Sequence, residues 1–264
     1  MPSTQREAMP YDVVIVGAGP AGLACACRIK QVNPDVSVCV LEKGSEVGAH
    51  ILSGAILETR ALDELFPNWQ ELGAPVTTLV NRDSILLLTS AGSSRKIPSI
   101  FAPKTMANHG NYIISLANLC RWLAEQAEQL GVDVFPGFAA SEILYDDNGA
   151  VKGVATGDMG VDKGGVNKAN FQAGMELHAS YTLFAEGCRG HLGKQLIDKF
   201  ALDEGKDPQH YSLGIKELWR VPSSQHQPGL VVHTAGWPLA ESGSLGGSFI
   251  YHFEDDLVSI GLVI

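Results

Sequence analysis

The sequence predicts an α/β fold, α+β over the whole chain, in which a parallel sheet with helices precedes an antiparallel sheet. An apolar run at 12–16 is followed by closely spaced glycines and a helical pattern, which is typical of a buried parallel strand and its crossover. Apolar runs at 36–41 and 132–135 have the composition of further parallel strands. Strand-like runs then alternate with turns at 211–219, 230–234, 248–253 and 257–264.

The glycines after the first strand have the spacing of a dinucleotide-binding turn, G-x-G-x-x-G. The first glycine permits a tight turn, the second lets a pyrophosphate approach the backbone, and the third lets the helix pack on the strand. The helical pattern at 23–31 would present free N–H groups to the phosphates. We therefore expect this turn to bind a cofactor through Gly17, Ala18, Gly19, Pro20, Ala21 and Gly22.

An acidic residue closes the second strand at the expected place, because Glu42 lies about 20 residues after Gly22. Its carboxylate would bind the ribose hydroxyls and repel a 2′-phosphate, which argues against NADP. The adjoining Lys43 is also expected to contact the cofactor. The alternative is a glycine turn without a ligand, which is disfavoured because strand, turn, helix, second strand and acid all agree.

Composition limits the kinds of partner and compartment. The formal net charge is −10, so a nucleic-acid partner is not expected. No apolar run has the length of a transmembrane helix, and the first ten residues lack the apolar core of a secretory signal. The five cysteines form no C-x-x-C pair, which favours buried thiols in a reducing compartment over a metal site or disulfides. The sequence stops inside the apolar run at 257–264, so we expect a longer protein.

A stretch rich in Gly, Ala and Ser follows Lys43, and backbone can approach a flat ligand there. Ser53 and Gly54 are expected contacts of a cofactor ring system; the alternative is a plain connecting loop. His50 is expected to be a structural residue. An amphipathic helix is predicted over 58–69, with Leu62, Leu65, Phe66 and Trp69 on one side. From the residues alone we favour core packing over contact with a bilayer interface.

The middle of the chain predicts a hairpin at 84–88 and 95–97, a helix over 116–130, and a hairpin at 142–145 and 151–155. Ala139, just past the third parallel strand, is where backbone could meet an adenine. The segment 156–174 is expected to be a solvated loop, since Asp158 and Asp162 lack the full calcium-loop signature. Strands at 177–179 and 181–185 lead to a glycine junction, where Gly187 is expected to contact the same cofactor, and to a helix ending at Phe200.

Several motifs resemble the electron transfer flavoprotein–ubiquinone oxidoreductase family. They are GAGPAGL at 17–23, GAHILSGAILE at 48–58, NHGNYI at 108–113, FAEGCRGHL at 184–192, GIKELW at 214–219, HTAGWPL at 233–239 and GGSFIYHF at 246–253. The first and fourth are shared with many flavin enzymes of the glutathione-reductase type, and the others are more specific. The resemblance covers nearly the whole chain.

The resemblance implies an oxidoreductase with a Rossmann-type FAD-binding domain at 1–202 and the start of an antiparallel quinone-binding sheet at 203–264, laid over the flavin. Such enzymes take electrons from reduced electron transfer flavoprotein and pass them to ubiquinone. The family is monotopic on the inner membrane, either the bacterial cytoplasmic membrane or the mitochondrial inner membrane. The stretch 47–68 is similar to its membrane-facing segment, and Gly246 and Gly247 match its quinone-binding glycine pair, for which the alternative is a strand bulge.

The resemblance also implies a [4Fe–4S] cluster, but its cysteine ligands would lie beyond residue 264 and no cysteine of this sequence can replace them. No catalytic acid–base pair or nucleophile stands out. Two rivals remain. One is a related FAD reductase or hydroxylase that uses NAD(P)H, similar to geranylgeranyl reductases. The other is an FAD-binding fragment without turnover.

Overall fold

The computed structural model describes residues 6–52 and 55–264. The chain divides into two compact units, each made of two stretches. The first unit is Met1–His50 with Cys120–Asp207, and the second unit is Ile51–Leu119 with Pro208–Ile264. This differs from the single boundary expected at 202/203. The reason is that β5 (Arg82–Ser90) pairs along its length with β15 (Leu230–Gly236), which joins the two stretches of the second unit in one sheet.

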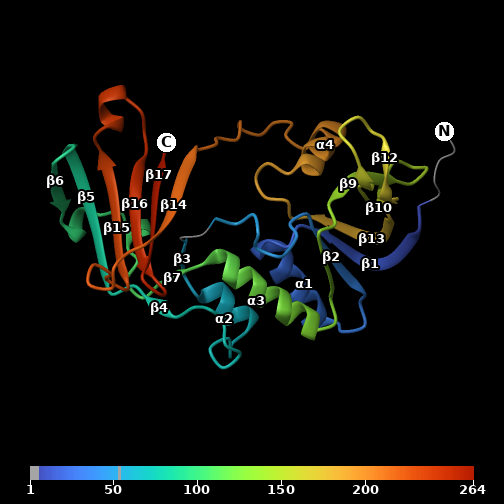
Figure 1. The fold of residues 1–264 in the computed structure, drawn as a ribbon, viewed down its shortest axis with the longest axis horizontal. Helices are drawn as coiled ribbons and strands as arrows, with labels where there is room; N and C mark the ends of the chain where they lie inside the picture. Colours follow the sequence, from blue (N-terminus) through green and yellow to red (C-terminus); the bar gives the residue numbers. More distant parts are fainter. Residues whose placement is uncertain (1–5, 53–54) are drawn as a thin grey trace. The chain divides into compact units, whose positions relative to one another are not determined.

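The first unit is built on a six-stranded sheet with the order β8-β2-β1-β13-β10-β9 (Figure 1). Its four parallel strands are β1 (Ala8–Val16), β2 (Val38–Glu42), β8 (Asp133–Pro136) and β13 (Glu176–Phe184). The antiparallel strands β9 (Ala140–Tyr145) and β10 (Val151–Thr156) form the predicted hairpin. The three predicted parallel strands are confirmed, and β13 is one continuous strand where two short ones were expected.

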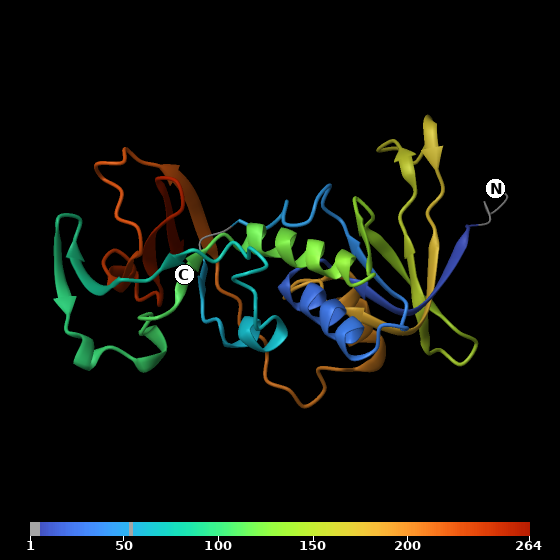
Figure 2. The ribbon, with the colours of Figure 1, turned by 90° about the horizontal axis from the view of Figure 1, so that it is seen from below.

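The helix α1 (Pro20–Val32) begins at the end of the glycine turn, where Pro20 fits because its missing N–H would be unpaired in any case. It ends at Val32, and the Lys30 ammonium donates to the carbonyl oxygens of Pro34 (2.5 Å) and Val36 (3.0 Å) just beyond. Helix α3 (Leu116–Gln129) lies beside α1 in both ribbon views (Figures 1 and 2). The Cys27 thiol donates to the Leu123 carbonyl oxygen at 3.8 Å, which ties the two helices together.

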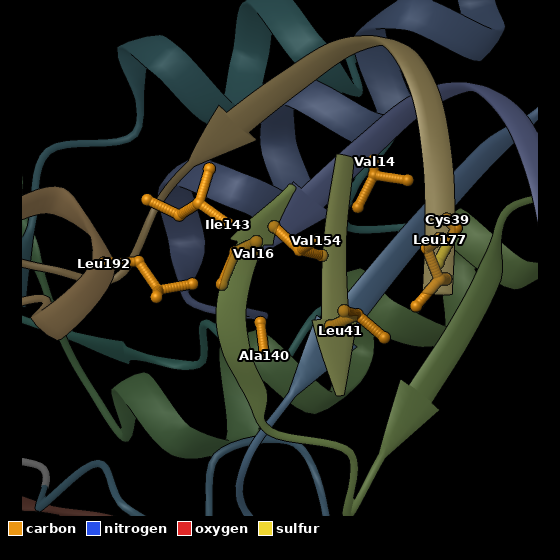
Figure 3. Close-up of a cluster of buried hydrophobic side chains, with 9 residues drawn as sticks. All are labelled: Val14, Val16, Cys39, Leu41, Ala140, Ile143, Val154, Leu177 and Leu192. Carbon is orange, nitrogen blue, oxygen red and sulfur yellow. The ribbon is translucent and has the colours of Figure 1, made fainter. Parts of the chain in front are cut away.

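A cluster of buried apolar side chains fills the other side of this sheet. As Figure 3 shows, alternate residues of β1 and β2 meet side chains of β9, β10, β13 and α4 (His191–Phe200). This alternation follows from the strand period of two, which puts every second side chain on one face. The members are Val14, Val16, Cys39, Leu41, Ala140, Ile143, Val154, Leu177 and Leu192.

The expected solvated loop at 156–174 is instead a short hairpin. Strand β11 (Met159–Val161) pairs with β12 (Asn167–Gln172). The Asp162 carboxylate accepts hydrogen bonds from the N–H groups of Gly164 (2.8 Å) and Val166 (2.9 Å), which closes the turn locally. The Asp158 carboxylate accepts one from Gly174 N–H at 2.8 Å. Both aspartates therefore have structural backbone partners.

The second unit is built on a sheet with the order β14-β17-β16-β15-β5-β6. The predicted hairpin of β5 with β6 (Ser93–Ile97) is confirmed, as are the predicted strands β14 (Gly214–Arg220), β16 (Gly247–Phe253) and β17 (Leu257–Val263). Neighbouring strands are antiparallel except β15 and β5, which run parallel. The sheet is therefore not purely antiparallel, because the hairpin of the first stretch adds to the edge strand of the second.

A small sheet in the same unit has the order β3 (Ala55–Leu57), β7 (Tyr112–Ile114) and β4 (Thr78–Leu79). Helix α2 (Arg60–Leu65) is shorter than predicted, because the chain turns at Phe66 ahead of Pro67. Leu62, Phe66 and Trp69 are buried, so the interpretation of the 58–69 stripe as core is confirmed for these three side chains. The Trp69 indole N–H donates to the Asp63 carboxylate at 2.7 Å.

Short 3₁₀ turns complete the second unit: η1 (Ser99–Phe101), η2 (Lys104–Met106) and η3 (Leu239–Ser242). In neither of the described stretches is a helix both long and apolar enough to cross a membrane.

The cysteines are mostly interior residues, as predicted. Cys27, Cys39 and Cys120 are buried, and burial raises the pKa of the Cys27 and Cys39 thiols to about 12. Cys188 is the exception, since it is exposed in the junction between β13 and α4.

The core cluster predicts a contrast within β13. Leu177 is 1% exposed and Leu183 is 36% exposed. Replacing Leu177 by Ala should lower the free energy of unfolding by about 2–5 kcal/mol, because it leaves a cavity in the cluster. The matched Leu183→Ala variant should lose under about 1 kcal/mol. Urea denaturation followed by circular dichroism measures both, and equal losses would contradict this account of the core.

Candidate dinucleotide-binding site

The glycine turn between β1 and α1 is shaped by two close backbone approaches. Gly17 has φ +107° and donates its N–H to the Leu41 carbonyl oxygen at 2.8 Å. A Cβ on Gly17 would lie 2.5 Å from the Ala185 carbonyl oxygen, and one on Gly22 would lie 2.1 Å from the Gly17 carbonyl oxygen. Both glycines are therefore required by the protein's own packing, as the sequence predicted for the turn and for the helix contact.

Gly19 differs from the other two glycines of the turn, Gly17 and Gly22. Its backbone is extended, with φ −79° and ψ 177°, a conformation open to any residue. A Cβ at Gly19 would meet no atom of the described protein within 4 Å. No described side chain caps α1 at this residue, so the helix N-terminus faces the same open space. This space beside a helix N-terminus fits a pyrophosphate lying against the Gly19 backbone.

The Glu42 carboxylate turns toward the glycine turn. One oxygen, Oε2, accepts a hydrogen bond from Ala18 N–H at 3.1 Å, and the other, Oε1, accepts one from Gly44 N–H at 2.6 Å. Each carboxylate oxygen has a second lone pair, so the group can still accept hydrogen bonds from a ligand. The predicted pairing of this acid with the glycine turn is thus present, and ribose hydroxyls could bind at the same carboxylate.

The loops after β2 and β8 lie side by side, because Gly137 N–H donates to the Gly44 carbonyl oxygen at 2.7 Å. Ala139 follows in this loop, is exposed, and accepts a hydrogen bond from Gly157 N–H at 3.1 Å. Its neighbour Phe138 lines a cavity of about 480 Å³ at the base of the β11–β12 hairpin. Lys43 is exposed next to Glu42. The segment expected to meet an adenine therefore lies beside the loop that carries the acid.

The junction between β13 and α4 reaches the glycine turn from the other side. Ala185, two residues before Gly187, donates its N–H to the Val16 carbonyl oxygen at 2.8 Å. Gly187 is exposed and has φ +80°, which favours glycine there. The Glu186 carboxylate accepts hydrogen bonds from Leu192 N–H (3.3 Å) and Gly193 N–H (2.8 Å), so the first turn of α4 is capped by protein. No sequence pattern predicts this capping role of Glu186.

The structure thus brings most of the predicted contacts to one edge of one sheet. The turn after β1, Glu42 and Lys43 after β2, Ala139 after β8 and Gly187 after β13 all follow the carboxyl ends of neighbouring parallel strands. Ligands of open α/β sheets bind at this edge. Ser53 and Gly54, the expected contacts of the ring system, lie outside the described residues.

The glycine pair expected at a quinone lies at the start of β16, in the second unit. A Cβ on Gly246 would be 2.1 Å from the Val263 carbonyl oxygen, and one on Gly247 would be 2.1 Å from the Thr234 carbonyl oxygen. Gly246 also has φ +151°. Packing inside the sheet therefore requires both glycines, so a ligand is not needed to explain them.

No group of three or more His, Cys, Asp and Glu side chains that could hold a metal ion occurs among residues 6–52 and 55–264.

A polar cluster in the second unit escaped sequence analysis. The His233 imidazole Nε2 lies 2.8 Å from the Tyr251 hydroxyl, and the Asp83 carboxylate accepts hydrogen bonds from both the backbone and the side-chain amide of Asn108. Burial lowers the pKa of His233 below its usual value and raises the pKa of Tyr251 to about 12. No local pattern predicts this cluster, because its members come from distant parts of the chain.

Comparison with known protein families matches two stretches. Residues 15–74 match a family described as an NAD(P)-binding Rossmann-like domain. Residues 211–264 match a family described as ETF-QO, ubiquinone-binding. The first stretch contains the glycine turn and Glu42, and the second contains His233, Gly246 and Tyr251.

Curated relatives are similar over almost the whole chain. An electron transfer flavoprotein–ubiquinone oxidoreductase of Pseudomonas aeruginosa is 63% identical over 98% of this chain and 48% of its own length. A probable one of Acinetobacter baylyi is 59% identical over 100% of this chain and 47% of its own length. The human mitochondrial one is 51% identical over 98% of this chain and 43% of its own length. The chain spans about half the length of the curated relatives that it matches.

Solved structures share the fold at low sequence identity. A geranylgeranyl bacteriochlorophyll reductase-like protein of Thermoplasma acidophilum has a TM-score of 0.63 at 17% identity, over 97% of this chain and 57% of its own. A flavoprotein/dehydrogenase of Cytophaga hutchinsonii has a TM-score of 0.63 at 16% identity, over 97% of this chain and 56% of its own. These likenesses support the predicted fold, a Rossmann-type domain of the kind found in FAD-dependent oxidoreductases.

The different surroundings of Gly19 and Gly22 predict different failures. Gly19→Val should leave the free energy of unfolding of cofactor-free protein within about 1 kcal/mol of wild type, since the side chain meets open space. The same protein is expected to lose bound FAD, because the side chain would fill the space in which the sequence predicts the pyrophosphate. Gly22→Val should instead destabilise the cofactor-free protein, because its Cβ would strike the Gly17 carbonyl oxygen.

Flavin absorbance after gel filtration and thermal unfolding of cofactor-free protein separate the two variants. Normal FAD content in folded Gly19→Val protein would refute the site.

Proposed function

The chain belongs to the electron transfer flavoprotein–ubiquinone oxidoreductase family, whose curated relatives it matches over about half their length, and from this membership we propose the following function. The chain binds FAD in its first unit and provides a ubiquinone-binding sheet in its second unit. In the intact protein it takes part in passing electrons from reduced electron transfer flavoprotein to ubiquinone at a membrane surface. The observation that carries the proposal is the Glu42 carboxylate turned toward the glycine turn, in a chain whose residues 211–264 match a ubiquinone-binding family.

The residues around the glycine turn fit FAD. The backbone at Gly19 would lie against the pyrophosphate, with the N-terminus of α1 behind it. Glu42 would bind the ribose hydroxyls of the adenosine, and its negative charge disfavours a ligand with a 2′-phosphate. Ala139 would meet the adenine, and Gly187 would meet the cofactor from the β13 side.

When bound, FAD would supply the electron-transfer chemistry, and the protein would bind, orient and tune it. The chain's own task near the glycine turn is therefore positional. Glu42 fixes the turn in the binding conformation through Ala18 N–H before any ligand arrives. Gly22 keeps α1 close to β1, so the helix N-terminus is held where the phosphates need it.

Within the segment 47–68, which resembles a membrane-facing segment, burial determines which side chains could contact lipid. Phe66 and Leu62 are buried and cannot face lipid, whereas Leu52 is 55% exposed. A second exposed apolar point of the same unit is η1, where Ile100 is 84% and Phe101 is 76% exposed. Exposed Arg95, Lys96 and Lys104 flank η1, and basic residues beside exposed apolar ones favour contact with anionic lipid. Leu52 and Phe101 are therefore better candidates for membrane contact than the face of α2.

A reductase that uses NAD(P)H is the main alternative, and the two differ in the electron donor. Reduced electron transfer flavoprotein should bleach the flavin absorbance of the intact protein within seconds, and excess NADPH should leave it oxidised over minutes. Stopped-flow absorbance measures both rates. Fast reduction by NADPH together with none by electron transfer flavoprotein would replace the proposal with that alternative. Bound flavin that neither donor reduces, or that reduces no quinone, would indicate a fragment without turnover.

Vesicle flotation tests the membrane surface. Leu52→Asp and Phe101→Asp should each reduce the fraction of protein that floats with anionic vesicles by about fivefold, because a carboxylate replaces exposed apolar surface. The matched control Gln70→Asp adds the same charge at another exposed position of the unit and should float like wild type. If all three variants float equally, neither residue contacts the membrane.

A further inference from the structure

The second unit contains two buried polar atoms that have no hydrogen-bond partner among the described residues. They are Nδ1 of His233 and Oδ1 of Asp83. A buried donor or acceptor left unpaired costs about 1–3 kcal/mol, so proteins seldom leave two of them in one place without a reason. Neither atom is explained by the packing of the sheet.

The two atoms lie on the same face of the large sheet. In the strand register, Asp83 of β5 and Tyr251 of β16 are both opposite Val231 of β15, and His233 is opposite Phe249. Residues directly opposite one another point to the same side of a sheet, and so do residues two apart on one strand. Asp83, His233, Phe249 and Tyr251 therefore share one face. The negative charge of Asp83 also raises the pKa of Tyr251 and opposes the lowering of the pKa of His233 by burial, as expected for groups on one face.

The Tyr251 hydroxyl decides which nitrogen of His233 carries the hydrogen. Tyr251 is buried, and its hydroxyl lies 2.8 Å from Nε2 of His233. A buried hydroxyl needs an acceptor for its hydrogen, so Tyr251 donates to Nε2. A neutral imidazole then carries its own hydrogen on Nδ1. Burial lowers the pKa of His233, which keeps the ring neutral at pH 7 and maintains this tautomer.

Nδ1–H of His233 is therefore a donor without an acceptor, and Oδ1 of Asp83 is an acceptor without a donor. Asp83 cannot turn away freely, because its other oxygen accepts hydrogen bonds from Asn108 N–H (2.9 Å) and the Asn108 side-chain amide (3.1 Å). One ligand oxygen satisfies both atoms if it accepts from His233 and, once it carries hydrogen, donates to Asp83. A quinone oxygen has this property, as a carbonyl in the oxidised form and as a hydroxyl in the reduced form.

The face also leads to the glycine pair. Gly247 begins β16 and lies two residues along the strand from Phe249, the residue opposite His233. Two residues of a strand span about 7 Å, which is comparable with the distance across a quinone ring and its two opposite oxygens. A ring with one oxygen at His233 could therefore reach the start of β16 with the other.

We propose that His233 and Asp83 form a seat for one oxygen of the quinone, with His233 as its hydrogen-bond and proton donor and Tyr251 as the group that returns a proton to the His233 ring. Naming the ligand a quinone rests on the proposed function. Reduction of the quinone takes two electrons, supplied through the flavin, and two protons. At the seat the N–H bond at Nδ1 breaks and an O–H bond of the quinol forms. Tyr251 passes its proton to Nε2, so the imidazole stays neutral, and the Tyr251 oxygen regains a proton from solvent. The second quinone oxygen takes its proton from solvent.

Nitrogen-15 NMR of histidine-labelled protein tests the seat without turnover. The His233 signal, identified by its loss in His233→Asn, should show the Nδ1–H tautomer in the free protein. Adding decylubiquinone should shift the Nδ1 resonance, and the exposed His210 should stay unmoved as the internal control. An Nε2–H tautomer, or a His233 signal unmoved at saturating quinone, would overturn the proposal.

Two substitutions then separate binding from proton transfer in the intact, FAD-loaded protein. The side-chain nitrogen of Asn occupies about the place of Nδ1, and that of Gln about the place of Nε2. His233→Gln should raise the KM for decylubiquinone about five- to tenfold, because the donor to the oxygen is lost. His233→Asn should keep the KM within about twofold but lower kcat about a hundredfold, because an amide does not transfer its proton.

The control for both is His210→Asn, which should match wild type. Thermal unfolding shows whether each variant is folded. If His233→Gln does not fold, the NMR result and the kinetics of His233→Asn still test the proposal. Wild-type protein that reduces no quinone would refute the proposed function while the NMR result still decides the seat. Wild-type protein that reduces quinone, with His233→Gln at the wild-type KM, would refute the seat alone.

Discussion

The hydrogen bonds of one carboxylate hold together the loops at the carboxyl edge of the first unit's sheet. Glu42 accepts the N–H of Ala18 with one oxygen and the N–H of Gly44 with the other. The turn after β1 and the loop after β2 are thereby fixed to the same group, and the loop after β8 is fixed to Gly44 in turn. Charge-assisted bonds of this kind are stronger than neutral ones. The arrangement keeps the edge in shape without a ligand, which lowers the ordering cost of binding one.

The glycines of this chain serve two different purposes, and the structure separates them. At Gly17, Gly22, Gly246 and Gly247 an added Cβ would strike a backbone oxygen of the protein itself. At Gly19 it would meet no atom of residues 6–52 and 55–264 within 4 Å, so the packing of these residues gives no reason for glycine there. A glycine with no internal reason is the stronger sign of a ligand. By this criterion the pyrophosphate position is better supported by the structure than the position assigned to the quinone by resemblance alone.

The sequence was sufficient to predict three of the first unit's four parallel strands, its glycine turn and the partner acid, because each has a signal in a short stretch of sequence. The hairpin at 159–172 was not predicted, because its glycines and charged residues are typical of solvated loops. The structure shows that hydrogen bonds to the Asp162 side chain are enough to form the turn between its strands. The parallel pairing of β5 with β15 and the cluster of Asp83 with His233 could not be predicted, since strand patterns do not specify which distant strands become neighbours.

The pairing of β5 with β15 also affects how the protein is made. When β5 leaves the ribosome, its partner strand β15 has not yet been synthesised. The whole second stretch of the first unit, Cys120–Asp207, is made before β15. During that time the β5–β6 hairpin has an unpaired edge with exposed apolar side chains, which is the condition under which nascent chains aggregate. The discontinuous second unit therefore leaves a strand edge without its partner until residue 236 has been made, and this edge is the part of the chain most exposed to wrong pairing during synthesis.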